Sequence, residues 1–246
     1  MIRSLTERKH SFIGEIMNGK IDLSDLGELY HDYSLFGARN RQLPGVYAPN
    51  QAAKSPIIRA YIQLAIAKCK AKLADQVTFT ELFCADGYYA MAARHLGADR
   101  SIGIDNDKSG QFAKAPIIAQ RLGLTNVNFV HADVAETLTF ERTHIVANLG
   151  GLYHVSDPAK VLRESYNLAR RFLIVQTVYS LASEDPGYFE TPAPGWQWGC
   201  RFSYEWFRSR IDELGGNALD RHINVLEANP RPEDRGSAYF LIEKPR

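Results

Sequence analysis

The chain has 246 residues, of which 45% are apolar and 23% charged, and its formal net charge is +1. This composition is typical of a globular protein with a sizeable core, and the near-zero charge excludes a global attraction to nucleic acid or acidic membranes. The three cysteines, Cys69, Cys84 and Cys200, are too far apart in sequence to suggest a disulfide framework or a zinc-ligand set. We therefore expect no metal and a reducing, cytoplasmic location.

The N-terminal part, residues 1–74, is predicted to be a helical extension that covers the ligand edge of a sheet. Its start, MIRSLTERKH, is too charged for a secretory signal, and no apolar run in the chain is long enough to span a membrane. Apolar spacing over residues 4–18 predicts an amphipathic helix, and Ser24 caps a second short one. Residues 30–49 are predicted to form an irregular surface loop, and Ser55-Pro56 to open a helix that ends near residue 71.

Residues 77–89, VTFTELFCADGYY, contain the turn around which the rest of the chain is organised. A short run of β-branched and aromatic side chains ends at Glu81 and leads through Asp86-Gly87 into a helical pattern over residues 89–96. Such a run predicts a buried parallel strand that feeds a helix. A turn of this kind is where an α/β sheet usually binds its ligand.

Two nucleotide-like cofactors suit such a turn, and the charges beside it distinguish them. A dinucleotide needs a G-x-G-x-x-G turn that presents backbone amides to its pyrophosphate. Here the corresponding positions are Phe83, Ala85 and Tyr88, and the carboxylates of Glu81 and Asp86 flank the turn. A carboxylate repels phosphate and attracts an ammonium group, by about 4 kcal/mol at 4 Å in an effective dielectric of 20. The charges therefore favour S-adenosylmethionine; a solvated corner without a ligand is the structural alternative.

Two further acidic residues follow the next two predicted strands. Asp105 ends the run SIGID, 24 residues after Glu81, and Asp133 lies just past the apolar part of NVNFVHADV. An acid at the tip of the second strand can accept hydrogen bonds from both hydroxyls of a ribose, and Asp133 with Val134 is placed to frame an adenine. Dehydrogenases share the first feature, and Asp105 or Asp107 can alternatively cap a helix.

Strands and helices alternate through the middle of the chain. Residues 107–122 predict a helix interrupted by a glycine and a proline, while residues 143–148 and 171–178 predict two more strands. Between those strands lies a helix that Asp157 caps and Pro158 begins. This alternation predicts a parallel sheet with helices on both faces.

The C-terminal part begins with a long loop, residues 179–203, of the kind that usually serves function. Ser203 caps a further helix, and the last two apolar runs predict an antiparallel hairpin. Aromatic residues of this part could build an acceptor pocket, although core packing is their more common role. The candidates are Trp196, Trp198, Tyr204 and Trp206, together with Tyr33, Phe36 and Tyr47 from the N-terminal part.

The turn ELFCADG and the segments after it resemble those of class I S-adenosylmethionine-dependent methyltransferases. That family's turn reads acid-x-G-x-G-x-G, of which only the third glycine, Gly87, is present here. The nearest subgroup is related to the tRNA wobble-uridine carboxymethyltransferase. It is similar in Gly87-Tyr88-Tyr89, in Gly103-Ile104-Asp105 and in Leu152-Tyr153-His154 followed by Pro158. The resemblance covers residues 77–177 and fades outside them.

The resemblance implies an α/β, Rossmann-like fold with a doubly wound, mostly parallel seven-stranded sheet, a C-terminal antiparallel hairpin and an N-terminal helical extension. Residues 75–246 would form the S-adenosylmethionine-binding domain, with an insertion at 179–203, and residues 1–74 an extension or lid. The implied enzyme moves a methyl group to an oxygen or nitrogen atom of a small metabolite or sugar-like acceptor. RNA is the less favoured acceptor, because no dense basic stripe stands out.

Three alternatives stay open at this point. The first is a tRNA-modifying methyltransferase or carboxymethyltransferase. The second is a non-catalytic binding module with the methyltransferase fold, and the third is an NAD(P)-dependent oxidoreductase, which the missing glycines disfavour. The oligomeric state is not predicted.

His154 is the candidate catalytic base, because it follows the fourth strand and an unperturbed pKa near 6.5 suits proton transfer at neutral pH. Tyr153 is the second catalytic candidate, and the alternative for both is a hydrogen bond that anchors the loop. The cofactor contacts are expected at the strand ends and in the turns that follow them. These residues are Glu81, Phe83, Cys84, Ala85, Asp86, Gly87, Tyr88, Asp105, Asn106, Asp133, Val134, Asn148 and Leu149.

Overall fold

The computed structural model describes residues 21–72 and 76–245, and seven of its strands form one central sheet. In chain order these are β5 (Thr78–Leu82), β6 (Arg100–Asp105), β7 (Val127–His131), β8 (Thr143–Leu149), β9 (Ala169–Tyr179), β12 (Asn217–Val225) and β13 (Gly236–Glu243). Their order across the sheet is β12-β13-β9-β8-β5-β6-β7. The strands from β9 to β7 pair in parallel, whereas β13 is antiparallel to both β9 and β12. The predicted α/β sheet with its C-terminal hairpin is confirmed.

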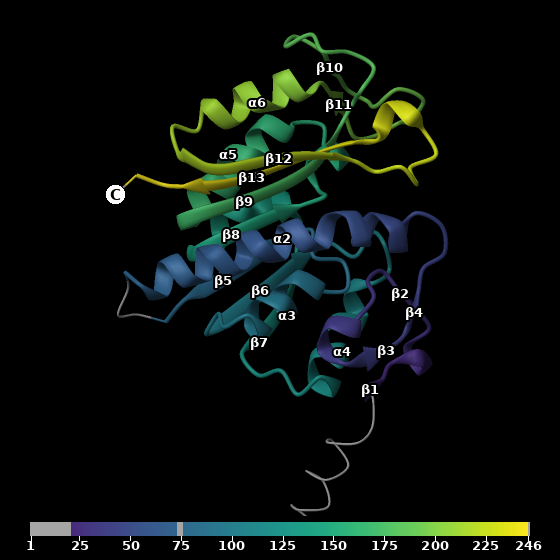
Figure 1. Cartoon of the computed structure of the whole chain (residues 1–246), viewed down its shortest axis with the longest axis vertical. Helices are drawn as coiled ribbons and strands as arrows, with labels where there is room; N and C mark the ends of the chain where they lie inside the picture. Colours follow the sequence, from purple (N-terminus) through teal and green to yellow (C-terminus); the bar gives the residue numbers. More distant parts are fainter. Residues whose placement is uncertain (1–20, 73–75, 246) are drawn as a thin grey trace, which may run out of the picture.

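Helices cover both faces of this sheet (Figure 1). On one face lie α2 (Tyr47–Lys70), α3 (Tyr88–His95) and α4 (Ala115–Arg121), and on the other α5 (Pro158–Leu168) and α6 (Tyr204–Asp212). Because side chains alternate along a strand, β8 contributes Ile145 and Ala147 to the first core and Val146 to the second. Its seven residues are all buried, as expected for a strand covered on both faces.

Helix α2 begins two turns earlier than the sequence predicted. It starts at Tyr47 rather than Ser55, so Pro56 lies inside the helix. A proline there removes one backbone hydrogen bond. Contacts with the C-terminal hairpin hold the first turns: Asn224 Nδ2 donates to the carbonyl oxygen of Ala53 at 3.0 Å. The predicted start was wrong because this tertiary support is invisible in the local sequence.

Residues 21–46 form short parallel strand pairs and turns, not the predicted irregular surface loop. Strand β1 (Ile21–Asp22) pairs with β3 (Ala38–Arg39), and β2 (Glu28–Leu29) pairs with β4 (Arg41–Gln42). Ser24 begins a single 3-10 turn, in which the Asp22 carboxylate accepts its N–H at 2.9 Å. Leu29 and Tyr33 are completely buried, which explains why the segment is ordered. The helix predicted over residues 4–18 lies outside the described residues.

The remaining predictions differ from the structure mainly at element boundaries. Residues 107–122 give only a 3-10 turn at 112–114 followed by α4, whose first turn contains Pro116. Asp157 caps α5 by accepting the N–H of Lys160 at 2.9 Å, as predicted. The insertion at 179–203 contains one two-residue pair, β10 (Phe189–Glu190) with β11 (Arg201–Phe202).

Candidate functional site

A cavity of about 620 Å³ lies at the carboxyl ends of the parallel strands. Here the strand connections diverge, because β5 leads outward to β6 whereas β8 leads to β9 on the other side. Ligands of open α/β sheets bind at this point, and the volume is typical of small-molecule sites. The strand ends line the cavity together with Tyr30, His31, Lys54 and Ile58 from the N-terminal part.

The turn after β5 keeps a left-handed backbone although two of the family's glycines are missing. The φ angles of Phe83, Ala85 and Gly87 are 61°, 48° and 80°. A side chain at such an angle costs about 1–2 kcal/mol, so the surrounding contacts must impose the conformation. Phe83 and Ala85 both line the cavity. Gly87 precedes α3 instead, and the Phe129 ring leaves no room for a side chain there.

The ring of Phe83 rests against Gly151, in the loop after β8. A Cβ atom at position 151 would overlap this ring, so Gly151→Ala is expected to lower the free energy of unfolding by about 1–2 kcal/mol. Phe83→Gly removes the ring and the left-handed strain, and should restore the stability of the Gly151→Ala variant. Urea denaturation of the four proteins in this double-mutant cycle measures the coupling. If the changes in the free energy of unfolding were purely additive, they would contradict the contact between Phe83 and Gly151.

Glu81 and Asp105 hold the turn together through backbone hydrogen bonds. Oε2 of Glu81 accepts the N–H of Ala90 in the first turn of α3 at 2.7 Å. The two oxygens of Asp105 accept the N–H groups of Ala85 at 2.9 Å and of Asp107 at 2.7 Å. Both carboxyl groups also line the cavity, and each oxygen has a second lone pair for a ligand.

Glu81 is only 1% exposed, and its burial raises the pKa of the carboxyl group well above the usual value. The hydrogen bond from Ala90 opposes this rise, whereas the charges of Asp86 and Asp105 add to it. The sequence predicts a full negative charge at Glu81, whereas burial favours the neutral carboxyl group. In the structure, a cationic group in the cavity would favour its ionised form.

Asp86 faces the N-terminal part and not the cavity. Its Oδ1 lies 2.5 Å from Nδ1 of His31, and its Oδ2 accepts the N–H of His31 at 2.9 Å. The hydroxyl of Tyr33 donates to the Asp86 carbonyl oxygen at 2.8 Å. The carboxylate is completely buried. The sequence predicted the Asp86 charge beside the ligand. In the structure, Asp86 instead holds residues 31–33 against the turn.

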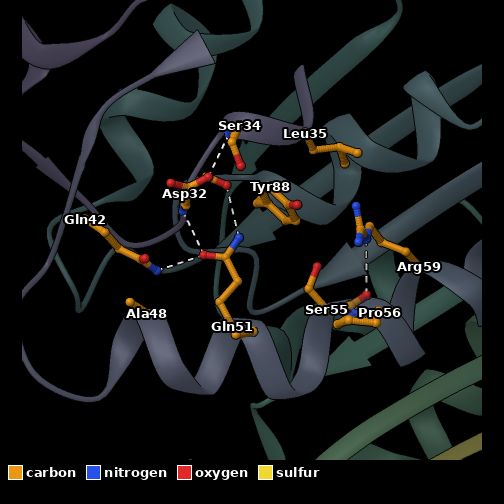
Figure 2. A pocket seen from close by; sticks show the side chains of 11 residues that line it. Asp32, Ser34, Leu35, Gln42, Ala48, Gln51, Ser55, Pro56, Arg59 and Tyr88 are labelled. Carbon is orange, nitrogen blue, oxygen red and sulfur yellow. Dashed lines mark hydrogen bonds between the residues drawn. The ribbon is translucent and has the colours of Figure 1, made fainter. Parts of the chain in front are cut away.

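Tyr88 also lies away from this cavity, and it lines a second one of about 470 Å³ beside α2 (Figure 2). Its ring stacks on His31, with ring centroids 4.8 Å apart. Across this second cavity, Gln51 accepts the N–H of Asp32 at 2.7 Å and donates to the Asp32 carbonyl oxygen at 3.0 Å. Because these polar groups pair with each other, we assign them the role of fastening residues 32–42 to α2. The neighbouring Tyr89 lines the first cavity instead.

Three more of the predicted cofactor residues are buried beside the strands and do not line the cavity. Cys84 packs against Gly103 of β6, Val134 belongs to the core under α5, and Asn148 Nδ2 donates to Ser165 Oγ of α5 at 3.0 Å. Asn106, Asp133 and Leu149 do line the cavity. Asn106 Nδ2 donates to Asp133 Oδ2 at 3.1 Å, which joins the loops after β6 and β7.

Of the two catalytic candidates, His154 lines the cavity and Tyr153 does not. The His154 ring stacks on Trp198, with centroids 5.2 Å apart and planes at 18°. Burial, together with the positive charges of Arg201 and Lys54, lowers the pKa of His154 below its usual value. The imidazole is therefore neutral at pH 7 and able to accept a proton, but it is a weaker base than the sequence argument assumed. Burial raises the pKa of Tyr153 to about 12.

Of the aromatic acceptor candidates, Trp198 alone lines the cavity. Trp196 is 45% exposed, whereas the Trp206 ring stacks on Phe189 at 4.9 Å and on Phe202 at 5.0 Å. Tyr33 packs edge-on against Tyr88. The more common role of such residues, core packing, therefore holds for most of them.

Sequence reasoning missed Tyr30, His31 and Lys54. The first two fell in the predicted surface loop, and Lys54 fell just before the predicted helix. Lys54 is half-buried on α2, and burial lowers its pKa to about 8. No local pattern links these positions to the β5 turn, because the pairing of distant segments brings them there.

Two further findings concern the described part of the chain as a whole. Among these residues, no group of three or more His, Cys, Asp or Glu side chains is arranged to hold a metal ion. None of the described helices is long and apolar enough to cross a membrane.

Comparison with known proteins places the fold. No family model and no curated sequence matches the chain. Solved structures do match, and the sheet order with its cavity at the strand ends is the Rossmann-like fold of class I S-adenosylmethionine-dependent methyltransferases.

Magnesium protoporphyrin IX methyltransferase from Synechocystis PCC 6803, solved with S-adenosylhomocysteine, is similar with a TM-score of 0.61 at 14% identity, over 87% of this chain and 93% of that one. The N-terminal domain of EvdMO1, solved in the presence of S-adenosylhomocysteine and D-fucose, has a TM-score of 0.61 at 16% identity, over 90% and 93%. The [4+2]-cyclase SpnF has a TM-score of 0.54 at 19% identity, over 75% and 81%. Likeness at these identities establishes the fold.

Proposed function

We propose that the cavity binds S-adenosylmethionine and that the protein transfers the methyl group to an oxygen or nitrogen atom of a small-molecule acceptor. The observation that carries this proposal is the row of carboxyl groups at the ends of three adjacent strands. Glu81, Asp105 and Asp133 belong to β5, β6 and the loop after β7, and all three line one cavity. Where these groups are ionised they repel a pyrophosphate, and all three accept hydrogen bonds from hydroxyl, amino and ammonium groups.

The lining residues fit the cofactor part by part. Asp105 accepts from the ribose hydroxyls with the lone pairs that the turn leaves free, and Asp133 with Asn106 receives the adenine. Phe83 and Ala85, with Glu81 beneath them, face the amino-acid part. The left-handed backbone of the turn supports the assignment, because Phe83 and Ala85 stand where the similar motif has glycine, the residue that adopts such φ angles most readily.

The comparisons support the cofactor more directly than the reaction. One similar protein is a methyltransferase solved with S-adenosylhomocysteine, and another is the N-terminal domain of EvdMO1, solved in the presence of that compound. The similar protein SpnF, in contrast, is named a [4+2]-cyclase. The fold therefore hosts more than one chemistry, and cofactor binding and turnover need separate tests. The finer resemblance to the tRNA wobble-uridine subgroup stays an observation on the sequence.

When bound, S-adenosylmethionine supplies an activated methyl group, whose S–CH₃ bond breaks as an O–CH₃ or N–CH₃ bond forms while the electron pair stays on sulfur. The protein's task is to orient the acceptor and to exclude water, which can supply up to about 7–11 kcal/mol. His154, neutral and at the cavity, is placed to accept the acceptor's proton at a ring nitrogen. Trp198, stacked on it, fixes the plane of the imidazole.

A ligand-dependent thermal shift tests the cofactor. S-adenosylmethionine and S-adenosylhomocysteine are expected to raise the melting temperature, by the equivalent of about 2.7 kcal/mol at a hundred times Kd, and NAD to leave it unchanged. A shift with NAD alone would establish the oxidoreductase alternative. No shift with any of the three would remove the proposal. Binding without methylation of any acceptor would favour the non-catalytic module.

Asp105→Ala is expected to weaken S-adenosylhomocysteine binding by about tenfold to a hundredfold, measured by isothermal titration calorimetry. The loss corresponds to hydrogen bonds between a carboxylate and the ribose, which are worth about 1.5–3 kcal/mol. Asp107→Ala is the matched control, because Asp107 accepts the N–H of Phe112 at 2.9 Å and does not line the cavity. Equal affinities of wild type and Asp105→Ala would refute the assignment.

A further inference from the structure

The cavity is divided into an acidic half and a half without carboxylates. Among its lining residues, the carboxyl groups belong to β5, β6 and the loop after β7. Over β8 and β9 the lining residues are neutral, and they include Leu149, His154 and Gln176. If the acidic half holds the nucleoside, as in the proposed function, the half over β8 and β9 is left for the acceptor.

Lys54 brings a positive charge into this cavity. Within the described residues its ammonium group makes no hydrogen bond and no ion pair, although it is half-buried. Its place is fixed on the β9 side of the sheet, because the neighbouring Asn50 donates to Asn229 Oδ1 at 2.9 Å and Ala53 accepts from Asn224. His154 lines the same cavity, and the charges of both Lys54 and Lys108 contribute to its lowered pKa.

A buried ammonium group without a counter-ion is unfavourable, and proteins normally pair it. The other ion pairs near this side of the cavity are complete in themselves: Arg201 Nε lies 2.6 Å from Asp234 Oδ1, and His31 contacts Asp86. Neither acid is available to Lys54. The three carboxyl groups of the cavity lie at the ends of β5, β6 and β7, and none of them contributes to the pKa of Lys54, which burial alone lowers. An anionic group of a ligand would therefore supply the missing counter-charge.

The same cavity presents the ring of Trp198, which is 47% exposed. One neighbour, His154, stacks on it, and another, Trp196, meets it edge-on with centroids 4.9 Å apart. These contacts hold the Trp198 ring in place while much of its surface stays open. An exposed, fixed indole that lines a cavity is suited to stack a planar ring.

We propose that the acceptor is a small aromatic carboxylate, whose ring stacks on Trp198 and whose carboxylate pairs with Lys54. This inference rests on the proposed function, because it takes the acidic half to be the nucleoside site. Lys54 and Trp198 are then specificity-determining residues for the acceptor. Neutral aromatic compounds satisfy only the ring contact, and aliphatic carboxylates satisfy only the charge.

Binding of 4-hydroxybenzoate, 4-hydroxybenzamide and cyclohexanecarboxylate tests the proposal by calorimetry, with and without saturating S-adenosylhomocysteine. We expect 4-hydroxybenzoate to bind at least tenfold more tightly than either of the other two compounds. Lys54→Met should remove that preference over the amide and leave the affinity for S-adenosylhomocysteine within twofold. Trp198→Leu should weaken 4-hydroxybenzoate at least fivefold, and Trp198→Phe, which keeps a flat ring, should restore most of the affinity.

Lys70→Met is the matched control, because Lys70 is exposed at the end of the same helix and does not line the cavity. A tenfold loss of S-adenosylhomocysteine affinity in Lys54→Met would assign Lys54 to the carboxylate of the cofactor and overturn the inference. Equal binding of 4-hydroxybenzoate and 4-hydroxybenzamide, or no binding of either, would also overturn it. Failure of S-adenosylhomocysteine to bind, with 4-hydroxybenzoate binding retained, would remove the proposed function and leave the anion site standing.

Discussion

Asp86→Ala is expected to lower the free energy of unfolding by about 3–5 kcal/mol, although Asp86 does not line the cavity. The substitution leaves both the N–H and the ring nitrogen of His31 without their partner, in a residue that is only 7% exposed. Residues 21–46 should then detach from the turn. Urea denaturation measures the loss, and limited proteolysis should show new cleavage within this segment.

Two variants make this result specific. Asp212→Ala removes an exposed carboxylate that pairs with Arg208 at 3.0 Å, and a change below about 1 kcal/mol is expected. Asp86→Asn keeps one oxygen that can accept from His31, so its loss should be smaller than that of Asp86→Ala. If Asp86→Ala were as stable as Asp212→Ala, the fastening role of Asp86 would have to be abandoned.

Lys54→Met is expected to stabilise the ligand-free protein at pH 7 by up to about 3 kcal/mol. Burial lowers the pKa of Lys54 from 10.5 to about 8, and a tenfold change in a protonation constant corresponds to about 1.36 kcal/mol. Below pH 8 the ammonium is charged in both the folded and the unfolded chain, so the whole cost of burying it is felt. Between pH 8 and 10.5 the unfolded chain binds more protons, and the cost disappears as pH rises.

The difference in unfolding free energy between Lys54→Met and wild type should therefore shrink from pH 8 to about pH 10. Comparison with wild type at each pH removes the contribution of the buried tyrosines, whose raised pKa values act in the opposite direction. Lys70→Met, on the exposed end of α2, should show no such dependence. A constant difference across this range would mean that Lys54 is solvated and carries no burial cost.

The strand ends of the site were predictable from the sequence because parallel strands leave a strong local signal. The apolar runs before Glu81 and Asp105 predicted buried strands, and the carboxyl ends of neighbouring parallel strands meet at one edge. Both residues do line the cavity. The alternation of strands and helices likewise predicted the sheet, whereas the start of α2, the strand pairs in residues 21–46 and the short length of α4 were not predicted.

Side-chain direction and long-range pairing were not predictable in this way. Asp86 is 55 residues from His31 in sequence, and nothing near either residue indicates that they pair. Tyr88 and Tyr89 follow each other at the start of α3, where adjacent side chains point about 100° apart, so only one of them can face the cavity. Lys54 lies at the cavity because α2 starts earlier than the sequence predicted, and its first turns depend on contacts with the C-terminal hairpin.

The loop after β5 and the loop after β8 touch where the Phe83 ring packs against Gly151. A glycine at position 83 would lack this ring, so the loop after β5 and the loop after β8 would be free to shift independently. Here, a ligand that pushes the Phe83 ring must also displace the backbone at Gly151, three residues before His154. We therefore expect occupancy of one half of the cavity to shift the loop that carries the imidazole in the other half.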